Sequence, residues 1–165
     1  MNKIVYKNQW FSVVNDKNWY YIREEHSHNG AVILILEDNE QFIFVENYRR
    51  AIDSIVIEAP RGYGEKGETS KETAIREAYE ETGYRIQEKN IQKIGSVYPN
   101  SAILDSQIDI YFASVSKNEQ IKQPDNEIIK IVKIDKDKML SYISNGQIKD
   151  TFSISAITFY MANSQ

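Results

Sequence analysis

The sequence contains no cysteine and only two histidines, His26 and His28. The absence of cysteine excludes disulfides, thiolate zinc sites, iron–sulfur clusters and cysteine nucleophiles. Two neighbouring imidazoles nearly exclude a metal site built from several histidines, and we interpret them as part of a loop. Any chemistry must therefore be carried by carboxylates, lysine, arginine, tyrosine or serine.

Long apolar runs are also missing. The longest one, residues 31–36, is far too short to span a bilayer, and the first residues lack the apolar segment of a signal peptide. We therefore expect no membrane partner and a cytoplasmic location. The chain has 24 acidic against 20 basic side chains, a formal charge of -4, which argues against a long nucleic acid as the partner.

The 165 residues suit a single domain, residues 1–165, and the apolar fraction of 41% is enough for a core. Runs rich in β-branched and aromatic residues predict strands. A capping box at Thr69 and Glu72, periodic apolar spacing and a stop at Gly83 predict a helix. The order of the elements indicates an α+β fold. The predicted strands are residues 10–14, 19–23, 31–37, 41–46, 54–58, 94–98, 108–114 and 128–134, and the predicted helices are residues 70–82, 135–145 and 151–161.

A glycine-rich loop precedes the predicted helix 70–82. It matches the G-x-G-x-x-G of dinucleotide-binding folds at Gly62, Gly64 and Gly67. However, a proline and an arginine separate the first glycine from the preceding strand, and no series of βαβ units surrounds it. The same stretch nearly spells a phosphate-binding loop, but Glu68 replaces the lysine and would repel phosphate. Taken alone, the segment also fits a plain surface loop.

Three glutamates, Glu77, Glu80 and Glu81, are expected on one side of this helix, opposite Ala74 and Ala78. Like-charge pairs at this spacing cost about 0.2–0.5 kcal/mol each on an exposed helix. The charge pattern alone therefore fits a solvated polar face. The alternative is a site for a hard divalent cation, because Mg²⁺ prefers oxygen ligands and its charge would remove the repulsion.

The complete spacing decides between these alternatives. Residues 62–84 follow the pattern G-x5-E-x7-R-E-U-x-E-E-x-G-U and resemble the Nudix box; we refer to them as the box. The box contains six acidic and three basic residues, so it carries most of the net charge of the chain. Tyr84 is an aromatic residue at a position that is usually aliphatic. The fixed positions of the pattern are Gly62, Glu68, Arg76, Glu77, Glu80, Glu81 and Gly83.

The resemblance to Nudix hydrolases implies a fold, a reaction and a cofactor. The fold is an α/β/α sandwich around a mixed sheet, and the reaction is hydrolysis of a nucleoside diphosphate linked to another group, with Mg²⁺ or Mn²⁺. Glu77, Glu80 and Glu81 would bind the metal and act in catalysis, together with the backbone carbonyl of Arg61. Glu68 and Arg76, the other two charged positions of the pattern, would hold the loop and orient these carboxylates. Bound cations would neutralise the diphosphate and lower the pKa of the attacking water.

Segments outside the box resemble the ADP-ribose pyrophosphatase subfamily. The chain departs from that subfamily at Arg61, where a small residue is usual, and after Pro99, where asparagine replaces glycine. These departures leave the nucleoside and the sugar open. The residues before Ala31 resemble an extra antiparallel sheet that pairs two subunits, so residues 1–30 imply a homodimer. The similar segments are residues 44–50 (Phe-Val-Glu-Asn-Tyr-Arg-Arg), 58–62 (Glu-Ala-Pro-Arg-Gly), the proline at position 99 and residues 145–150.

The resemblance also suggests which residues contact the substrate: Arg49, Arg50, Glu58 and Pro99. The two arginines could clamp a phosphate bidentately, or they could be an ordinary surface pair. Glu58 could receive an adenine amino group or a ribose hydroxyl, or it could be a capping acceptor.

The general base is expected in the loop before the last strand. Glu127 matches best and Asp125 is next, while a polar turn is the alternative. The leading function is Mg²⁺-dependent hydrolysis of ADP-ribose or a nucleotide sugar, a small-molecule substrate. The alternatives are a Nudix-like domain that senses a nucleotide without cleaving it, and a pyrophosphohydrolase for dinucleoside polyphosphates or nucleoside triphosphates. The intact set of box carboxylates favours an enzyme.

Overall fold

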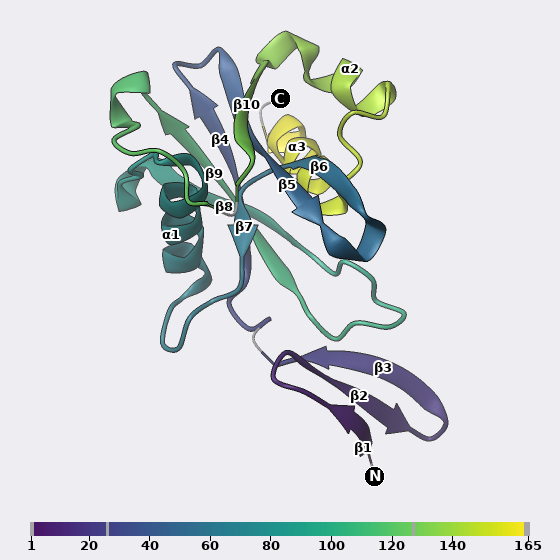
Figure 1. Cartoon of the computed structure of the whole chain (residues 1–165). Coiled ribbons are helices and arrows are strands. Elements are labelled where there is room, and N and C mark those ends of the chain that lie inside the picture. The colour runs from purple at the N-terminus through teal and green to yellow at the C-terminus, as the bar shows by residue number, and fades with distance from the viewer. Residues whose placement is uncertain (1, 26, 127, 164–165) are drawn as a thin grey trace.

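The computed structural model describes residues 2–25, 27–126 and 128–163. A seven-stranded sheet forms the main body, and the N-terminal residues form a separate three-stranded sheet (Figure 1). The strands are β1 (Lys3–Lys7), β2 (Phe11–Asp16), β3 (Trp19–Glu24), β4 (Ala31–Glu37), β5 (Gln41–Arg49), β6 (Ser54–Glu58), β7 (Arg61–Gly62), β8 (Ile91–Val97), β9 (Ile108–Val115) and β10 (Lys130–Asp135). The helices are α1 (Ser70–Thr82), α2 (Met139–Ser144) and α3 (Thr151–Asn163), with short 3-10 helices η1 (Arg50–Ile52), η2 (Glu88–Asn90), η3 (Lys117–Glu119) and η4 (Lys136–Lys138).

Strand β4 is central to the main sheet. The strand order is β10-β5-β4-β9-β8, with β6 paired to β5 and β7 paired to β4. Strands β4 and β9 are parallel, and the other pairings in this sheet are antiparallel. The predicted α+β fold with a mixed sheet is therefore confirmed.

Every residue of β4 is buried, because helices cover both faces of the sheet. Val32, Leu34 and Leu36 pack into the apolar cluster that includes α3. Ala31, Ile33 and Ile35 pack into the cluster that includes Ala74 and Ala78 of α1. Alternation along one strand thus builds two cores, and Figure 1 shows α1 and α3 on opposite sides of the sheet. Within the described residues, no helix has both the length and the apolar character needed to cross a membrane.

Helix α1 begins and ends where the sequence predicts. Thr69 and Glu72 form a reciprocal capping box at its start. Gly83 closes its end with a φ of 76°. A Cβ at this glycine would lie 2.0 Å from the carbonyl oxygen of Lys122, so a side chain does not fit there. The capped helix is a rigid platform for the box glutamates.

The N-terminal sheet, β1 to β3, contacts the main body through the loop after β8. The backbone N–H of Ile22 donates to the carbonyl of Ile103 at 2.7 Å, and the Arg23 Nε donates to the Asp105 carboxylate at 3.0 Å. This sheet also exposes several aromatic side chains, among them Trp10, Trp19 and Tyr20. The extra antiparallel sheet expected from the sequence is present.

Some elements differ from the predictions. Strand β1 was not expected, and all five of its residues are exposed, so no buried face left a pattern to find. Strand β7 has two residues, too few for any periodicity. Strand β8 begins three residues before the predicted start at position 94. The predicted helix 135–145 is divided into η4 and α2.

Candidate active site

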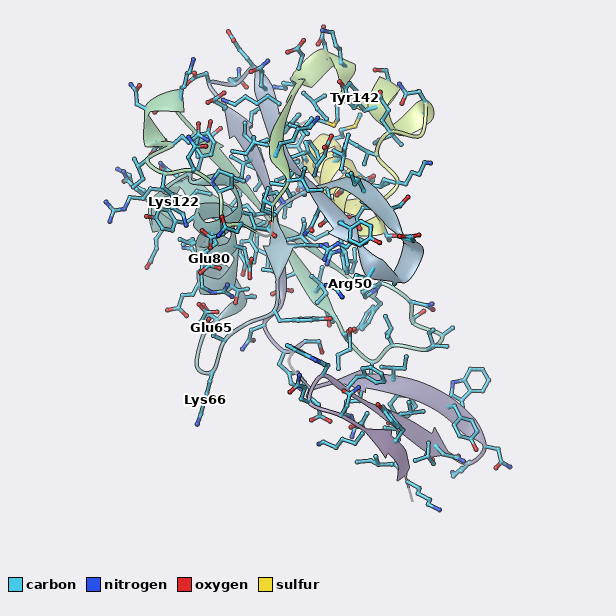
Figure 2. The ribbon with its side chains drawn as sticks, in the orientation of Figure 1. Arg50, Glu65, Lys66, Glu80, Lys122 and Tyr142 are labelled. Atoms are coloured by element: carbon cyan, nitrogen blue, oxygen red, sulfur yellow. The ribbon has the colours of Figure 1, made fainter. Side chains whose placement is uncertain are left out.

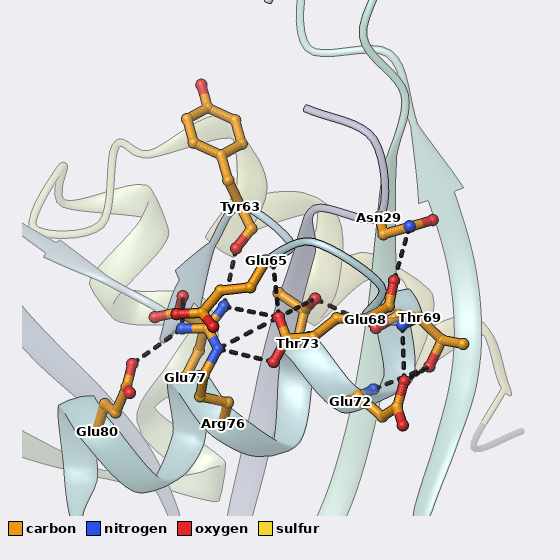
Figure 3. A network of polar contacts seen from close by, with 10 residues as sticks. All are labelled: Asn29, Tyr63, Glu65, Glu68, Thr69, Glu72, Thr73, Arg76, Glu77 and Glu80. Carbon is orange, nitrogen blue, oxygen red and sulfur yellow. Dashed lines mark hydrogen bonds and ion pairs between the residues drawn. The ribbon is translucent and has the colours of Figure 1, made fainter. Parts of the chain in front are cut away.

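Arg76 is the centre of the polar network in the box (Figure 3). Its Nη1 donates to Glu77 at 2.7 Å and to Glu80 at 2.9 Å. Its Nη2 donates to the backbone carbonyl of Tyr63 at 2.8 Å, and its Nε donates to Glu68 at 3.0 Å. One guanidinium therefore connects the loop of the box to two of the three glutamates.

Glu68 holds the loop in place. Besides pairing with Arg76, its carboxylate accepts hydrogen bonds from the backbone N–H of Glu65 at 2.8 Å and from the hydroxyl of Thr73 at 3.2 Å. The hydrogen bonds from Arg76 keep the pKa of the Glu68 carboxyl below its usual value. This glutamate is thus held as a carboxylate that orients other groups.

Gly62 leaves the space that the Glu77 carboxylate occupies. A Cβ at position 62 would lie 1.9 Å from the Glu77 Oε1. Glu81 is fixed next to it, because its Oε2 accepts the backbone N–H of Arg61 at 3.1 Å. Two half-buried carboxylates therefore meet the short strand β7 at consecutive residues.

Burial controls the ionisation of these carboxylates. It raises the pKa of Glu77, although Arg76 opposes the shift. Burial, followed by the negative charge of Glu77, raises the pKa of Glu81 to about 8. The protein itself therefore compensates a negative charge on Glu81 only poorly.

The three glutamates line one cleft of about 530 Å³ together with Pro124 and Asp125. The backbone N–H of Asp125 donates to the carbonyl of Glu80 at 2.9 Å, which fixes this loop over the end of the helix. Lys122 pairs with the Asp125 carboxylate at 2.6 Å. The predicted base Glu127 lies outside the described residues.

The side chains that line this cleft have the chemistry that Mg²⁺ or Mn²⁺ requires. They provide several carboxylate oxygens as metal ligands, and their negative charge is only partly compensated by the protein. Among the described residues, no three acidic or histidine side chains are yet arranged around one point as metal ligands. Figure 3 shows Arg76 between Glu77 and Glu80, and its guanidinium donates to both carboxylates. Glu81 is held instead by a backbone donor, the N–H of Arg61.

The predicted substrate residues fall into two groups. Arg49 and Glu58 form a pair in which Nε donates to Oε2 at 3.1 Å and Nη2 contacts Oε1. Glu58 is 1% exposed, and Arg61 adds a third contact to it at 3.2 Å. Arg50, in contrast, begins η1 with an exposed side chain (Figure 2). Pro99 lines a separate small pocket of about 160 Å³.

Two side-chain networks near the box were not expected. The hydroxyl of Tyr63 donates to Glu24 of β3 at 2.6 Å, and Ser106 donates to the other oxygen of Glu24 at 2.7 Å. Tyr84, in turn, contacts buried Glu37, which also accepts from Lys133 at 2.6 Å. Only the unusual tyrosine at position 84 was visible in the sequence as a departure from the box pattern.

Comparison with known families identifies the fold. A model described as NUDIX domain matches residues 26–147, which is most of the chain. The chain belongs to the Nudix family. The predicted resemblance is thus confirmed, and the chain is a Nudix pyrophosphatase-type hydrolase.

Two relatives each align over 140 residues, which are 83% of this chain and 75% of the relative. One is the methanol dehydrogenase activator of Bacillus methanolicus, with 33% identity. The other is the ADP-ribose pyrophosphatase of Bacillus subtilis (strain 168), with 29% identity. A solved structure of an ADP compounds hydrolase superposes with a TM-score of 0.76 and covers 98% of this chain and 90% of its own. Its 18% identity supports the fold alone.

Proposed function

We propose that this Nudix protein hydrolyses the pyrophosphate bond of a nucleoside diphosphate linked to another group, with Mg²⁺ or Mn²⁺ as the cofactor. The observation that carries the proposal is the cleft that Glu77, Glu80 and Glu81 line beside the 124–126 loop. Half-buried carboxylates on a capped helix are suited to hold cations against an anionic substrate.

In this proposal the three glutamates and the backbone carbonyl of Arg61 hold the metal. When bound, the metal neutralises the diphosphate and lowers the pKa of a water molecule. Arg76 sets the direction of Glu77 and Glu80, so it acts through these residues. Glu127 is proposed to accept the proton of the attacking water, with Asp125 of the same loop as the alternative.

The substrate is proposed to extend from this cleft toward Arg49 and Glu58. Arg49 is fixed by Glu58 and still has a third of its side chain exposed, which suits it to contact a phosphate oxygen. Arg50 and Pro99 are proposed as more peripheral contacts. ADP-ribose or a nucleotide sugar is the proposed substrate, and the name of the Bacillus subtilis relative supports this class.

The test is a hydrolysis screen with Mg²⁺ or Mn²⁺ over ADP-ribose, nucleotide sugars, dinucleoside polyphosphates and nucleoside triphosphates. We expect turnover of a nucleoside diphosphate derivative and release of a mononucleotide. Glu77→Gln and Glu81→Gln should each lower kcat at least about 100-fold. Loss of a residue that only orients a metal ligand lowers activity by up to about 100-fold, and loss of a ligand itself should cost at least as much. The exposed Glu88 after α1 provides a matched control, and Glu88→Gln should retain parental turnover.

Two alternatives remain as outcomes of this screen. Preferential turnover of a dinucleoside polyphosphate or a nucleoside triphosphate would replace the proposed substrate class. Binding of a nucleotide without any turnover would favour a sensing or regulatory domain, and one relative is named for a regulatory role, the methanol dehydrogenase activator of Bacillus methanolicus. Unchanged turnover in both glutamate variants would overturn the metal assignment.

We also propose that residues 1–165 are one Nudix domain that forms a homodimer through residues 1–30, and that it works in the cytoplasm. The dimer proposal is supported by exposed apolar side chains on the N-terminal sheet, including Tyr6, Trp10, Trp19 and Tyr20, each more than half exposed. Light scattering over a range of concentrations tests it, because a constant monomer mass would reject the dimer. Cell fractionation tests the compartment.

A further inference from the structure

The position of Arg61 has a consequence for the substrate. This arginine stands immediately before the box, and its backbone N–H holds Glu81 at 3.1 Å. Arg61 also lines another cleft, between η1, β6 and the segment before α3, which has a volume of about 550 Å³. Position 61 therefore connects the proposed catalytic cleft with a second one.

The guanidinium of Arg61 stacks over the Phe152 ring, 4.9 Å from its centroid, but the protein satisfies its N–H groups only in part. It contacts Glu58 at 3.2 Å, although Arg49 already occupies both oxygens of that carboxylate. Asp150 lies 4.0 Å away, and its Oδ2 accepts the backbone N–H and the hydroxyl of Ser153, each at 2.8 Å. The Nε of Arg61 is buried with no hydrogen-bond partner among the described residues.

The charges around this second cleft are unequal. Three cations line it, Arg49, Arg61 and Lys149, against two carboxylates, Glu58 and Asp150. Lys149 is exposed and makes no ion pair within the described part of the chain. Asp150 mainly caps α3 through Ser153, so it compensates Arg61 only weakly. A ligand that brings a negative charge would complete this arrangement.

We propose that Arg61, with Lys149, forms an anion subsite that selects nucleoside diphosphates bearing a further phosphate monoester. The proposal rests on the function proposed above, because it takes the ligand to be part of the substrate of the adjacent catalytic cleft. An arginine suits this role because its planar fork presents two N–H groups to the oxygens of one phosphate. Arg49 is fixed by Glu58 and forms the wall of the subsite.

Equilibrium binding in EDTA tests the subsite without hydrolysis. Calorimetry compares the affinity for ADP-ribose 2′-phosphate with that for ADP-ribose. A second pair, UDP-glucuronate and UDP-glucose, tests whether a carboxylate can replace the additional phosphate. We expect the phosphorylated ligand to bind about tenfold more tightly, the value of one charge-assisted hydrogen bond. A similar preference for UDP-glucuronate would support the same subsite and extend it to carboxylates.

Arg61→Ala should abolish this preference, and Arg61→Lys should retain part of it. Lys149→Ala, at an exposed position that should not affect folding, should reduce the preference by a smaller factor. Arg85→Ala is the matched control, because Arg85 is an exposed arginine beyond α1 on the other side of the sheet. Equal binding within both ligand pairs, or a preference that survives in both Arg61→Ala and Lys149→Ala, would overturn the subsite. Failure of the hydrolysis screen would instead count against the proposed reaction.

Discussion

Glu81 should destabilise the metal-free protein as the pH rises. Its carboxyl has a pKa of about 8 in the folded chain, against 4.5 when unperturbed, because of burial and the charge of Glu77. The folded state therefore holds the Glu81 proton more tightly than the unfolded state does. Stability must then fall with increasing pH between about 4.5 and 8, and level off above this range. The usual carboxylate, with a lowered pKa, has the opposite dependence.

The magnitude follows from the difference between the two pKa values. One pKa unit corresponds to about 1.4 kcal/mol, so the charged form costs about 1 kcal/mol at pH 5 and about 4 kcal/mol at pH 8. Glu81→Gln removes the charge but keeps an oxygen that can accept the Arg61 N–H. This variant should therefore be more stable than the parent by about these amounts, and inactive.

Urea unfolding in EDTA at pH 5, 6.5 and 8 measures this effect. The stability gain of Glu81→Gln should increase through the series, whereas Glu88→Gln should follow the parent at every pH. Mg²⁺ added at pH 8 should stabilise the parent more than the variant, because ligand binding to the folded state adds to stability. A gain of the same size at pH 5 and pH 8 would refute the reasoning, since it could not come from ionisation.

Three further predictions concern the box and the N-terminal sheet. Gly62→Ala should displace the Glu77 carboxylate, which lies where the new methyl group would stand, and lower kcat in the hydrolysis assay with little change in secondary structure by circular dichroism. Tyr84→Phe should lower the free energy of unfolding by about 1–3 kcal/mol, because buried Glu37 loses a donor; an unchanged urea midpoint would contradict this. Trp19→Ser should lower the mass measured by light scattering at micromolar concentrations if the sheet β1–β3 pairs two subunits, and an unchanged mass would exclude Trp19 from that interface.

The parts of the fold that the sequence predicts well carry a local signal. Helix α1 has a capping box, an apolar face and a glycine stop within one segment, and its predicted bounds are those observed. The buried run of β4 is likewise visible as consecutive apolar residues. Strand β1 has no buried residue, and β7 is held only by pairing with β4, so their signals come from tertiary structure.

In the candidate site, too, some features are predicted by local sequence and others depend on tertiary structure. Helical spacing is enough to predict that Glu77, Glu80 and Glu81 are close together. It does not predict that one arginine fork contacts two of them and the carbonyl of Tyr63, since this depends on how the loop returns to the helix. The three-way contact of Glu58 with Arg49 and Arg61 arises because β5 and β6 pair while β7 follows directly.

The reason for a tyrosine at position 84 lies in residues that are far away in the sequence. It is fully buried, and its hydroxyl contacts Glu37 at the end of β4, while Lys133 of β10 donates to both groups. Burial alone would raise the pKa of Glu37, but the hydrogen bonds from Lys133 and Tyr84 outweigh it and lower this pKa. An aliphatic residue at position 84 would leave the buried carboxylate and the lysine with one partner fewer. Since the three side chains satisfy one another, Tyr84→Leu should cost more stability in the parent than in a chain whose Glu37 and Lys133 are both replaced by apolar residues, and a double-mutant cycle that finds no such coupling would reject this account.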